Sequence, residues 1–143
     1  IKIMNDLKVG QILWLKVRYQ IDQVASIEHP MLIADINDNY IEIIAIDKTA
    51  GKLHNLYHKY NYFINSENPK ETVLYEDSYA QFNTKLTIEN CTMLSKFRKT
   101  KDTLSSKKLN DLLKEYYDYQ NNNIINEERI VYMTQEEIIE LNS

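Results

Sequence analysis

The sequence predicts an α+β domain, in which five or six short strands form a small, strongly bent sheet or barrel and one long amphipathic helix packs on it. Two observations carry this prediction. Short apolar runs separated by turn residues fill the region from about 7 to 94, and a 3.6-residue apolar period follows over about 105–119. The 143 residues, 43% of them hydrophobic, suit one domain with its own core, which a strand and a short helix over about 128–142 extend.

The first strands are predicted by apolar runs with turn residues between them. Gly10 starts a strand that continues through "QILWLKVRY" to Tyr19, with apolar side chains on both faces as in a small barrel. Met31–Ile36 and Tyr40–Ile46 are two further strands, and the turn at Asn37–Asn39 joins them as a hairpin.

The middle of the chain is less regular. The stretch Lys52–Phe63, "KLHNLYHKYNYF", predicts either a short helix or an irregular aromatic loop. Ser66–Glu71 predicts a turn, and Thr72–Asp77 and Ser78–Ile88 predict strands, because β-branched and aromatic residues are frequent in them.

The long helix has the clearest signals. Ser105 fits the N-cap position, and Leu104 and Leu109 form a hydrophobic staple across it. An apolar stripe at helical spacing predicts a core or dimer contact through Leu109, Leu112, Leu113, Tyr116 and Tyr117. Beyond "QNNN", residues 129–133 predict a late strand, and "TQEE" from Thr134 predicts a capping box for a short final helix.

The charge balance and the cysteine content narrow the class of protein. With 17 basic and 21 acidic residues the net charge is -4, so indiscriminate nucleic-acid binding is not expected, although Lys96–Lys108 can form a local basic face. No apolar run approaches the roughly 20 residues of a membrane span, and no membrane partner is expected. The single Cys91 cannot form an internal disulfide, and no signal-peptide pattern is visible, which suits a cytoplasmic protein.

The sequence predicts no metal and no cofactor. His54 and His58 have the i, i+4 spacing of two zinc ligands on a helix, but "HNLYH" lacks the glutamate of such motifs and no cysteine cluster is near. With only two glycines, the chain lacks the glycine-rich turns of nucleotide-binding folds.

Five segments follow one another in a recognisable order. They are "GQILW" from Gly10, "HPMLIADI" from His29, "IIAIDKTAGK" from Ile43, "EDSYAQFNTKLTIENCTML" from Glu76, and the helix from Ser105. This order, over about residues 7 to 119, resembles the PemK/MazF family, the toxin ribonucleases of toxin–antitoxin pairs. The resemblance implies an SH3-like antiparallel β-barrel with a C-terminal helix. It also implies metal-independent cleavage of single-stranded, mRNA-like RNA by a homodimeric toxin that a cognate antitoxin holds in check.

The chain departs from the family at its catalytic positions. His29 stands where the family has an arginine before the proline, and Asp47 stands where it has a threonine. Leu86, with Lys85 beside it, replaces a further arginine. The stretch 52–70, which is rich in tyrosine and histidine, has no clear counterpart in the family.

Metal-free RNA cleavage uses the 2′-hydroxyl as nucleophile, and it needs a base, an acid and positive charge at the phosphate. His29 is predicted to be the acid or the base, because imidazole changes its charge near neutral pH. Asp47 is expected to orient that imidazole, Thr49 to hydrogen-bond a phosphate oxygen and Arg18 to supply charge. The other side chains expected to bind RNA are cations and aromatics: Lys16, Lys48, Lys52, His54, Tyr57, His58, Lys59 and Lys85.

These residues also have structural explanations. His29 can be only the strand boundary that Pro30 imposes, Asp47 a turn former, and the stretch 52–70 a surface flap over the barrel. For function, the same barrel without the family's arginine can be a non-catalytic RNA- or protein-binding module, encoded by a phage or a mobile element. A small structural partner protein is a third possibility.

Overall fold

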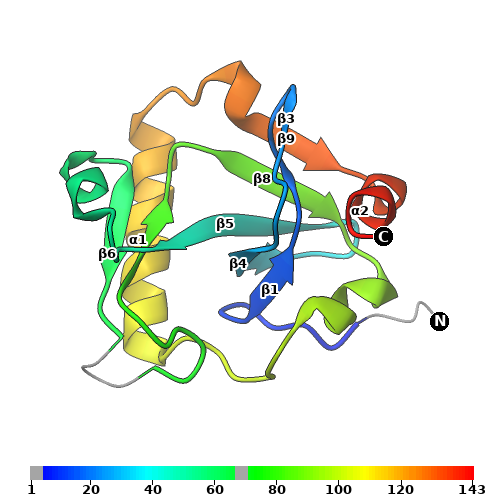
Figure 1. Cartoon of the computed structure of the whole chain (residues 1–143), viewed down its shortest axis with the longest axis horizontal. Coiled ribbons are helices and arrows are strands. Elements are labelled where there is room, and N and C mark those ends of the chain that lie inside the picture. Colours follow the sequence, from blue (N-terminus) through cyan, green and yellow to red (C-terminus); the bar gives the residue numbers. More distant parts are fainter. Residues whose placement is uncertain (1–4, 67–70) are drawn as a thin grey trace.

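The computed structural model describes residues 5–66 and 71–143 as an α+β fold that is mostly sheet (Figure 1). The strands are β1 (Ile12–Leu15), β2 (Arg18–Gln20), β3 (Gln23–Val24), β4 (His29–Ile36), β5 (Tyr40–Lys48), β6 (Asn61–Ile64), β7 (Ser78–Gln81), β8 (Lys85–Glu89) and β9 (Ile130–Met133). The helices are α1 (Ser106–Asn122) and α2 (Gln135–Leu141), and short 3₁₀ turns form η1 (Leu53–Tyr57), η2 (Thr92–Phe97) and η3 (Glu127–Arg129). The predicted α+β class and the long helix are confirmed.

β5 is the central strand of the sheet. β4 pairs with it along one edge, while β8 and β7 share its other edge, opposite Tyr40–Ile43 and Ile46–Lys48 respectively. The strand order is therefore β1-β4-β5-β7-β6, with a branch from β5 through β8 to β9. A register shift between Ile33 and Asp35 of β4 marks a β-bulge, which bends a sheet and increases its twist.

Two features of the sheet differ from the prediction. Within the described residues it is not closed into a barrel, so the SH3-like barrel is not confirmed. It is also not wholly antiparallel, because β9 lies parallel to β8, with Ile130 opposite Lys85. The chain between these two strands passes through η2 and α1, and parallel neighbours require a long crossover of this kind.

The hairpin of β4 and β5 is confirmed, and its turn has a local cause. The side-chain oxygen of Asn37 accepts hydrogen bonds from the backbone N–H groups of Asn39 and Tyr40, both at 2.9 Å. An asparagine that bonds its own backbone in this way closes a tight turn without help from the rest of the fold. Because these hydrogen bonds join residues two and three positions apart, the hairpin could be predicted from the sequence.

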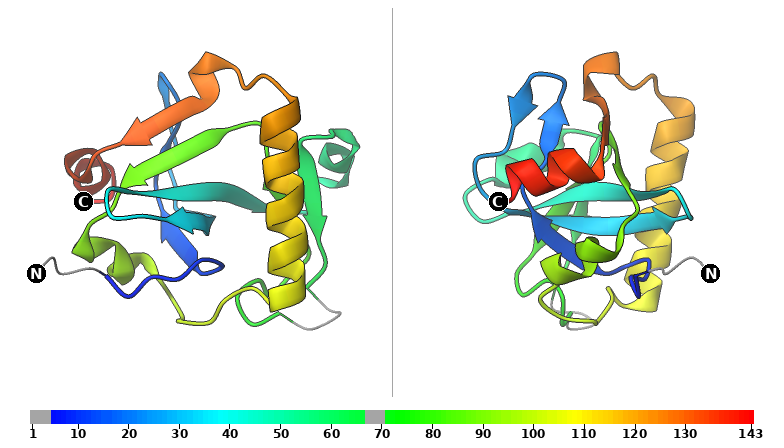
Figure 2. Two further views of the ribbon diagram at one scale, coloured as in Figure 1. Left: turned by 180° about the vertical axis from the view of Figure 1, so that it is seen from behind. Right: turned by 90° about the vertical axis from the view of Figure 1, so that its right-hand side faces the viewer.

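Apolar side chains alternate between the two faces of the sheet and form two layers. Ile12 and Leu32 belong to the layer that α1 covers through Leu112 and Tyr116. Leu13, one residue on from Ile12, belongs to the opposite layer, which β8, β9 and α2 complete. Figure 2 shows α1 lying across one side of the sheet and α2 near the other end. The prediction that both faces of the first strand are apolar is confirmed.

α1 begins where the sequence predicted, but a distant residue caps it. Ser105 occupies the N-cap position, yet its side chain makes no capping hydrogen bond with a described residue. The carboxylate of Glu71, which is 3% exposed, instead accepts a hydrogen bond from the backbone N–H of Ser105 at 3.0 Å. It also lies 3.4 Å from the ammonium of Lys108. Negative charge at this end of a helix is stabilised by the helix dipole.

Three other local predictions are corrected or only partly tested. The strand predicted to reach Tyr19 divides into β1 and β2, because Asn142 hydrogen-bonds the backbone N–H and C=O of Lys16, at 2.7 and 3.0 Å. Residues 72–77 are irregular, since no strand in the described ranges forms a ladder with them. Lys52–Phe63 is divided between η1 and β6, and the predicted turn at 66–71 falls mostly on 67–70, outside the described residues.

A buried tyrosine–glutamate pair joins α1 to the sheet. The hydroxyl of Tyr116 donates a hydrogen bond to Oε2 of Glu42 on β5, and the two residues are 0% and 8% exposed. Burial, and after it the Glu42 carboxylate, raise the pKa of Tyr116. We expect Tyr116→Phe to lower the free energy of unfolding by about 1–3 kcal/mol in urea titrations, because it leaves a buried carboxylate without its donor.

Tyr117→Phe is the matched control for this prediction. Tyr117 is the next residue on α1, is 39% exposed, and its hydroxyl hydrogen-bonds to none of the described residues. Its removal should change the free energy of unfolding by no more than about 0.5 kcal/mol. Equal losses in the two variants would contradict the assignment of a stabilising bond to Tyr116 and Glu42.

Candidate active site

His29 and Asp47 line the same cavity, which has a volume of about 190 Å³. The sheet register explains why they meet. Met31 of β4 lies opposite Ala45 of β5, and His29 and Asp47 lie two residues further along these antiparallel strands, on the same face. The remaining wall is formed by Val17, Tyr19, Ala25, Met31, Ala45, Ile46, Gln81, Thr84, Leu86 and Arg129.

The Asp47 carboxylate is held by three donors. Its Oδ2 accepts hydrogen bonds from the Lys52 ammonium at 2.7 Å and from the Tyr79 hydroxyl at 3.3 Å. Its Oδ1 accepts one from the backbone N–H of Lys48 at 2.9 Å. The bond to Asp47 raises the pKa of Lys52, which favours the charged ammonium. The Asp47 carboxylate is therefore paired with the Lys52 ammonium at the edge of the cavity.

Asp47 was expected to orient the His29 imidazole, and the structure gives it different partners. No hydrogen bond joins these two described side chains, although both line one cavity. His29 is partly buried, and its imidazole hydrogen-bonds to none of the described residues. Its ring is thus available to a group that enters the cavity.

Arg129 is the functional candidate that the sequence analysis missed. It is the last residue of η3, and its Nε donates hydrogen bonds to the carbonyl of Asn83 at 3.2 Å and the hydroxyl of Thr84 at 3.1 Å. Among the described residues no carboxylate forms an ion pair with it. The cavity therefore contains a fixed positive charge whose position is set by neutral partners, which suits an anionic ligand.

One signal in the sequence could have indicated Arg129. It is the only basic residue after Lys114, it follows two glutamates, and it is the first residue of the predicted strand 129–133. A lone arginine at the start of a strand in an acidic stretch is an unusual surface residue. Its distance along the chain from His29, however, made their proximity impossible to infer from local patterns.

Arg18, which was expected to supply charge, faces α2 and is not among the residues that line the His29 cavity. Side chains alternate along an extended chain, so Val17 and Tyr19 line the cavity while Arg18 points to the other side. Its Nε donates to the Glu137 carboxylate at 2.7 Å, and this bond raises the pKa of Arg18.

The capping box predicted at Thr134 is confirmed in part. The Thr134 hydroxyl accepts a hydrogen bond from the backbone N–H of Glu137 at 3.2 Å, while the Glu137 side chain pairs with Arg18.

Thr49 is also structural. It is 6% exposed, and its hydroxyl donates to the carbonyl of Asp77 at 3.2 Å. Its backbone N–H donates to the same carbonyl at 3.0 Å. These bonds tie the end of β5 to the segment before β7, and Thr49 is not among the residues that line the His29 cavity.

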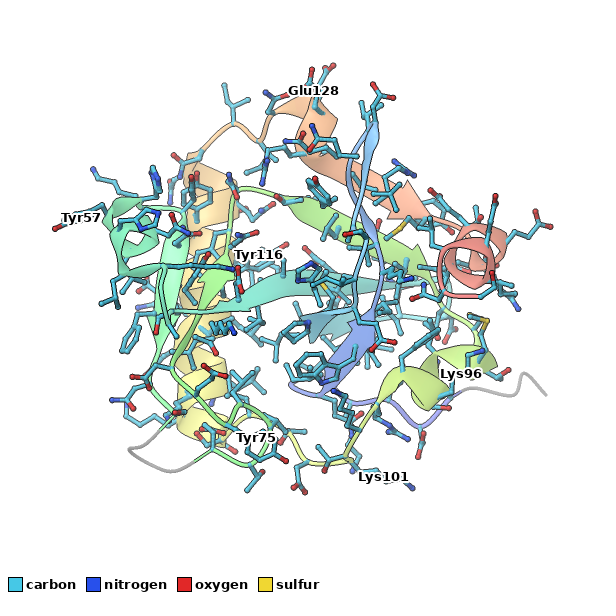
Figure 3. All side chains as sticks on the ribbon, viewed as in Figure 1. Tyr57, Tyr75, Lys96, Lys101, Tyr116 and Glu128 are labelled. Atoms are coloured by element: carbon cyan, nitrogen blue, oxygen red, sulfur yellow. The ribbon has the colours of Figure 1, made fainter. Side chains whose placement is uncertain are left out.

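The residues expected to bind RNA are dispersed. Lys52 is paired with Asp47, and Lys16 is fixed through its backbone by Asn142. His54 and Tyr57 lie on η1, which projects from the fold, with Tyr57 90% exposed at its tip (Figure 3). The other predicted side chains are exposed at separate places: Lys48 at the end of β5, His58 and Lys59 after η1, and Lys85 at the start of β8.

The basic stretch Lys96–Lys108 lies away from the cavity and is partly neutralised. Arg98 and Lys101 both pair with Asp6, at 2.8 and 3.5 Å, and Lys99 lies 3.9 Å from the centre of the Trp14 ring. Figure 3 places Lys96 and Lys101 at the opposite end of the molecule from Glu128, the neighbour of Arg129. This basic face is therefore separate from the His29 cavity.

Residues 5–66 and 71–143 contain neither a metal-binding cluster nor a membrane-spanning helix. No three His, Cys, Asp or Glu side chains come together there as a metal-binding group. Neither α1 nor α2 combines the length and the apolar character that crossing a bilayer requires. Comparison of the chain with protein-family models, with curated proteins and with solved structures gave no match.

Proposed function

We propose that this chain is an endoribonuclease that cleaves single-stranded RNA without a metal ion, using the cavity lined by His29 and Arg129. The observation that supports this proposal is their presence in one cavity, where the imidazole is unpartnered and the guanidinium lacks a carboxylate among the described residues. An imidazole can move a proton near neutral pH, and a guanidinium can bind two oxygens of one phosphate.

The reaction needs two proton transfers. A base removes the proton of the 2′-hydroxyl, the freed oxygen attacks the adjacent phosphorus, and the bond to the 5′-oxygen breaks as that oxygen gains a proton. His29 would perform one of these transfers, and Arg129 would stabilise the charge that develops on the phosphoryl oxygens. The Lys52 ammonium, held at 2.7 Å by Asp47 of the cavity wall, is a further group with a proton to give.

Arg129 also bears on the resemblance to the PemK/MazF family. In that family an arginine precedes the proline that here follows His29. We propose that the chain is a divergent relative whose bent sheet stands in for the family's barrel, and that the catalytic cation comes from η3 instead. We also propose, as part of this relationship, that the chain is a homodimeric, cytoplasmic toxin that a cognate antitoxin inhibits.

A second candidate function is a non-catalytic RNA-binding module. The observation that favours it is the engagement of Asp47 by Lys52 and Tyr79, so that the His29 imidazole has no carboxylate partner among the described residues. A cavity whose imidazole lacks such a partner can hold a phosphate without completing both proton transfers.

Incubation of the purified protein with mixed RNA in EDTA separates these candidates. The proposal predicts discrete fragments that carry a 2′,3′-cyclic phosphate at one end and a 5′-hydroxyl at the other. RNA that is bound intact, with affinity that falls steeply as salt rises, would support the binding module instead. If the protein neither cleaves nor binds RNA, both candidate functions are overturned.

A further inference from the structure

A second, smaller cavity of about 110 Å³ adjoins the His29 cavity. Amide side chains form most of its wall, and we refer to it as the amide cavity: Asn55, Tyr60, Asn61, Gln81, Asn83 and Arg129. Gln81 and Arg129 line both cavities, so the two cavities are neighbours with a shared wall. The second cavity is therefore placed beside any phosphate that Arg129 holds.

The amide cavity offers hydrogen-bonding groups that the protein leaves unused. The side-chain amide of Gln81 hydrogen-bonds to none of the described residues, which leaves a donor and an acceptor free. The Nδ2 of Asn61 donates to the carbonyl of Asn55 at 2.9 Å, while the buried Oδ1 of Asn61 has no donor among the described residues. A buried acceptor without a partner is costly, and a donor that enters the cavity would satisfy it.

The walls of this cavity are fixed by secondary structure. Asn61 of β6 lies opposite Gln81 of β7, and the N–H of Phe82 donates to the carbonyl of Tyr60 at 2.6 Å. The Tyr60 ring stacks on the His58 ring, with centroids 4.8 Å apart and planes 24° from parallel. An aromatic surface therefore lies next to a pair of amides whose backbones are held in a sheet.

We infer that the amide cavity binds one unpaired base of the RNA, adjacent to the phosphate held at His29 and Arg129. This inference rests on the proposed function. Side-chain amides present a donor beside an acceptor, which matches the edges of nucleobases, and aromatic rings stack on exposed bases. A phosphate alone would require cations, and Arg129 is the sole cation among the described residues of this wall. Asn55, Tyr60 and Asn61 all lie in the stretch 52–70.

The test is binding of the four nucleoside 5′-monophosphates, with ribose 5-phosphate as the control that lacks a base. Side-chain amide signals of Gln81 and Asn61 should shift further in nuclear magnetic resonance spectra with at least one nucleotide than with ribose 5-phosphate. That nucleotide should also bind more tightly than ribose 5-phosphate. Equal affinities, or amide signals that respond equally to ribose 5-phosphate, would overturn the inference.

Two variants sharpen the test. Gln81→Met keeps the length of the side chain and removes the amide, so the preference for the nucleotide over ribose 5-phosphate should fall roughly 5- to 100-fold. Gln81→Glu replaces the amide donor with an acceptor and should also lower the preference for the nucleotide over ribose 5-phosphate. Tyr75→Ala, at a residue that is 85% exposed and outside both cavities, should leave this preference unchanged. Retention of the full preference in both Gln81 variants would contradict the assignment.

This experiment is independent of cleavage. If the protein cuts RNA but binds nucleotides and ribose 5-phosphate equally well, the base site is wrong and the ribonuclease stands. If nucleotides bind with a base preference and RNA is not cut, the ribonuclease is wrong and the base site belongs to a binding module.

Discussion

Replacing His29 with alanine should lower the rate of RNA cleavage by about 10²–10⁴-fold, the usual contribution of a general acid or base. The imidazole lines the cavity with Arg129 and hydrogen-bonds to none of the described residues. Its loss should therefore remove a proton-transfer group without breaking a contact that the fold needs. Cleavage rates on a defined RNA in EDTA give the measurement, with RNA affinity measured in parallel.

Chemical rescue distinguishes this role from a structural one. Free imidazole added to His29→Ala should restore part of the cleavage rate, because it can enter the vacated space and carry the proton. The same addition to Arg129→Ala should restore nothing. Cleavage by His29→Ala at the wild-type rate would remove His29 from the mechanism and leave the cavity as a binding site.

Arg129→Ala should lower the cleavage rate by about 10²–10³-fold, the cost of losing one preorganised group that stabilises developing charge. Arg129→Lys should recover only part of that loss, because an ammonium cannot form the two parallel bonds of a guanidinium. Arg129 also donates to Asn83 and Thr84, at 3.2 and 3.1 Å. Urea unfolding of each variant is needed to separate the loss of charge from a loss of stability.

Salt dependence provides a second measurement on Arg129. A lost phosphate contact should reduce the slope of log affinity against log salt by about 0.7 for a single strand. Arg18→Ala is the matched control, because Arg18 pairs with Glu137 of α2 at 2.7 Å and faces away from the cavity. It should lower stability and leave the slope unchanged. A salt slope that is reduced for Arg18→Ala and not for Arg129→Ala would support the prediction from the sequence that Arg18 supplies the charge at the phosphate.

The parts of the fold that were predicted correctly have local causes. The β4–β5 hairpin depends on Asn37, which bonds to the backbone two and three residues on. The apolar stripe of α1 lies at the 3.6-residue period, and its members Leu112 and Tyr116 are fully buried. The hairpin and helix signals lie within a few residues of the features they predict. His29 and Asp47 were placed at one site through the resemblance to the PemK/MazF family, and they line one cavity because of the register of β4 and β5.

The features that were missed depend on contacts between distant parts of the chain. Glu71 caps α1 from another loop, Asn142 interrupts the first predicted strand, and Glu137 turns Arg18 away from the cavity. Arg129 reaches the cavity only because β9 pairs in parallel with β8. Local periodicity does not encode such pairings, and a single sequence gives no other access to them.

The central claim is cleavage through the 2′-hydroxyl at the cavity of His29 and Arg129, and one substrate pair tests it most directly. An RNA with a mapped cleavage site is compared, in EDTA, with the same RNA carrying a single 2′-deoxynucleotide immediately 5′ to the scissile phosphate. We expect the first to be cut to a 2′,3′-cyclic phosphate by the wild-type protein and not by His29→Ala, and the second to remain intact. Equal cleavage of the two RNAs would contradict the account.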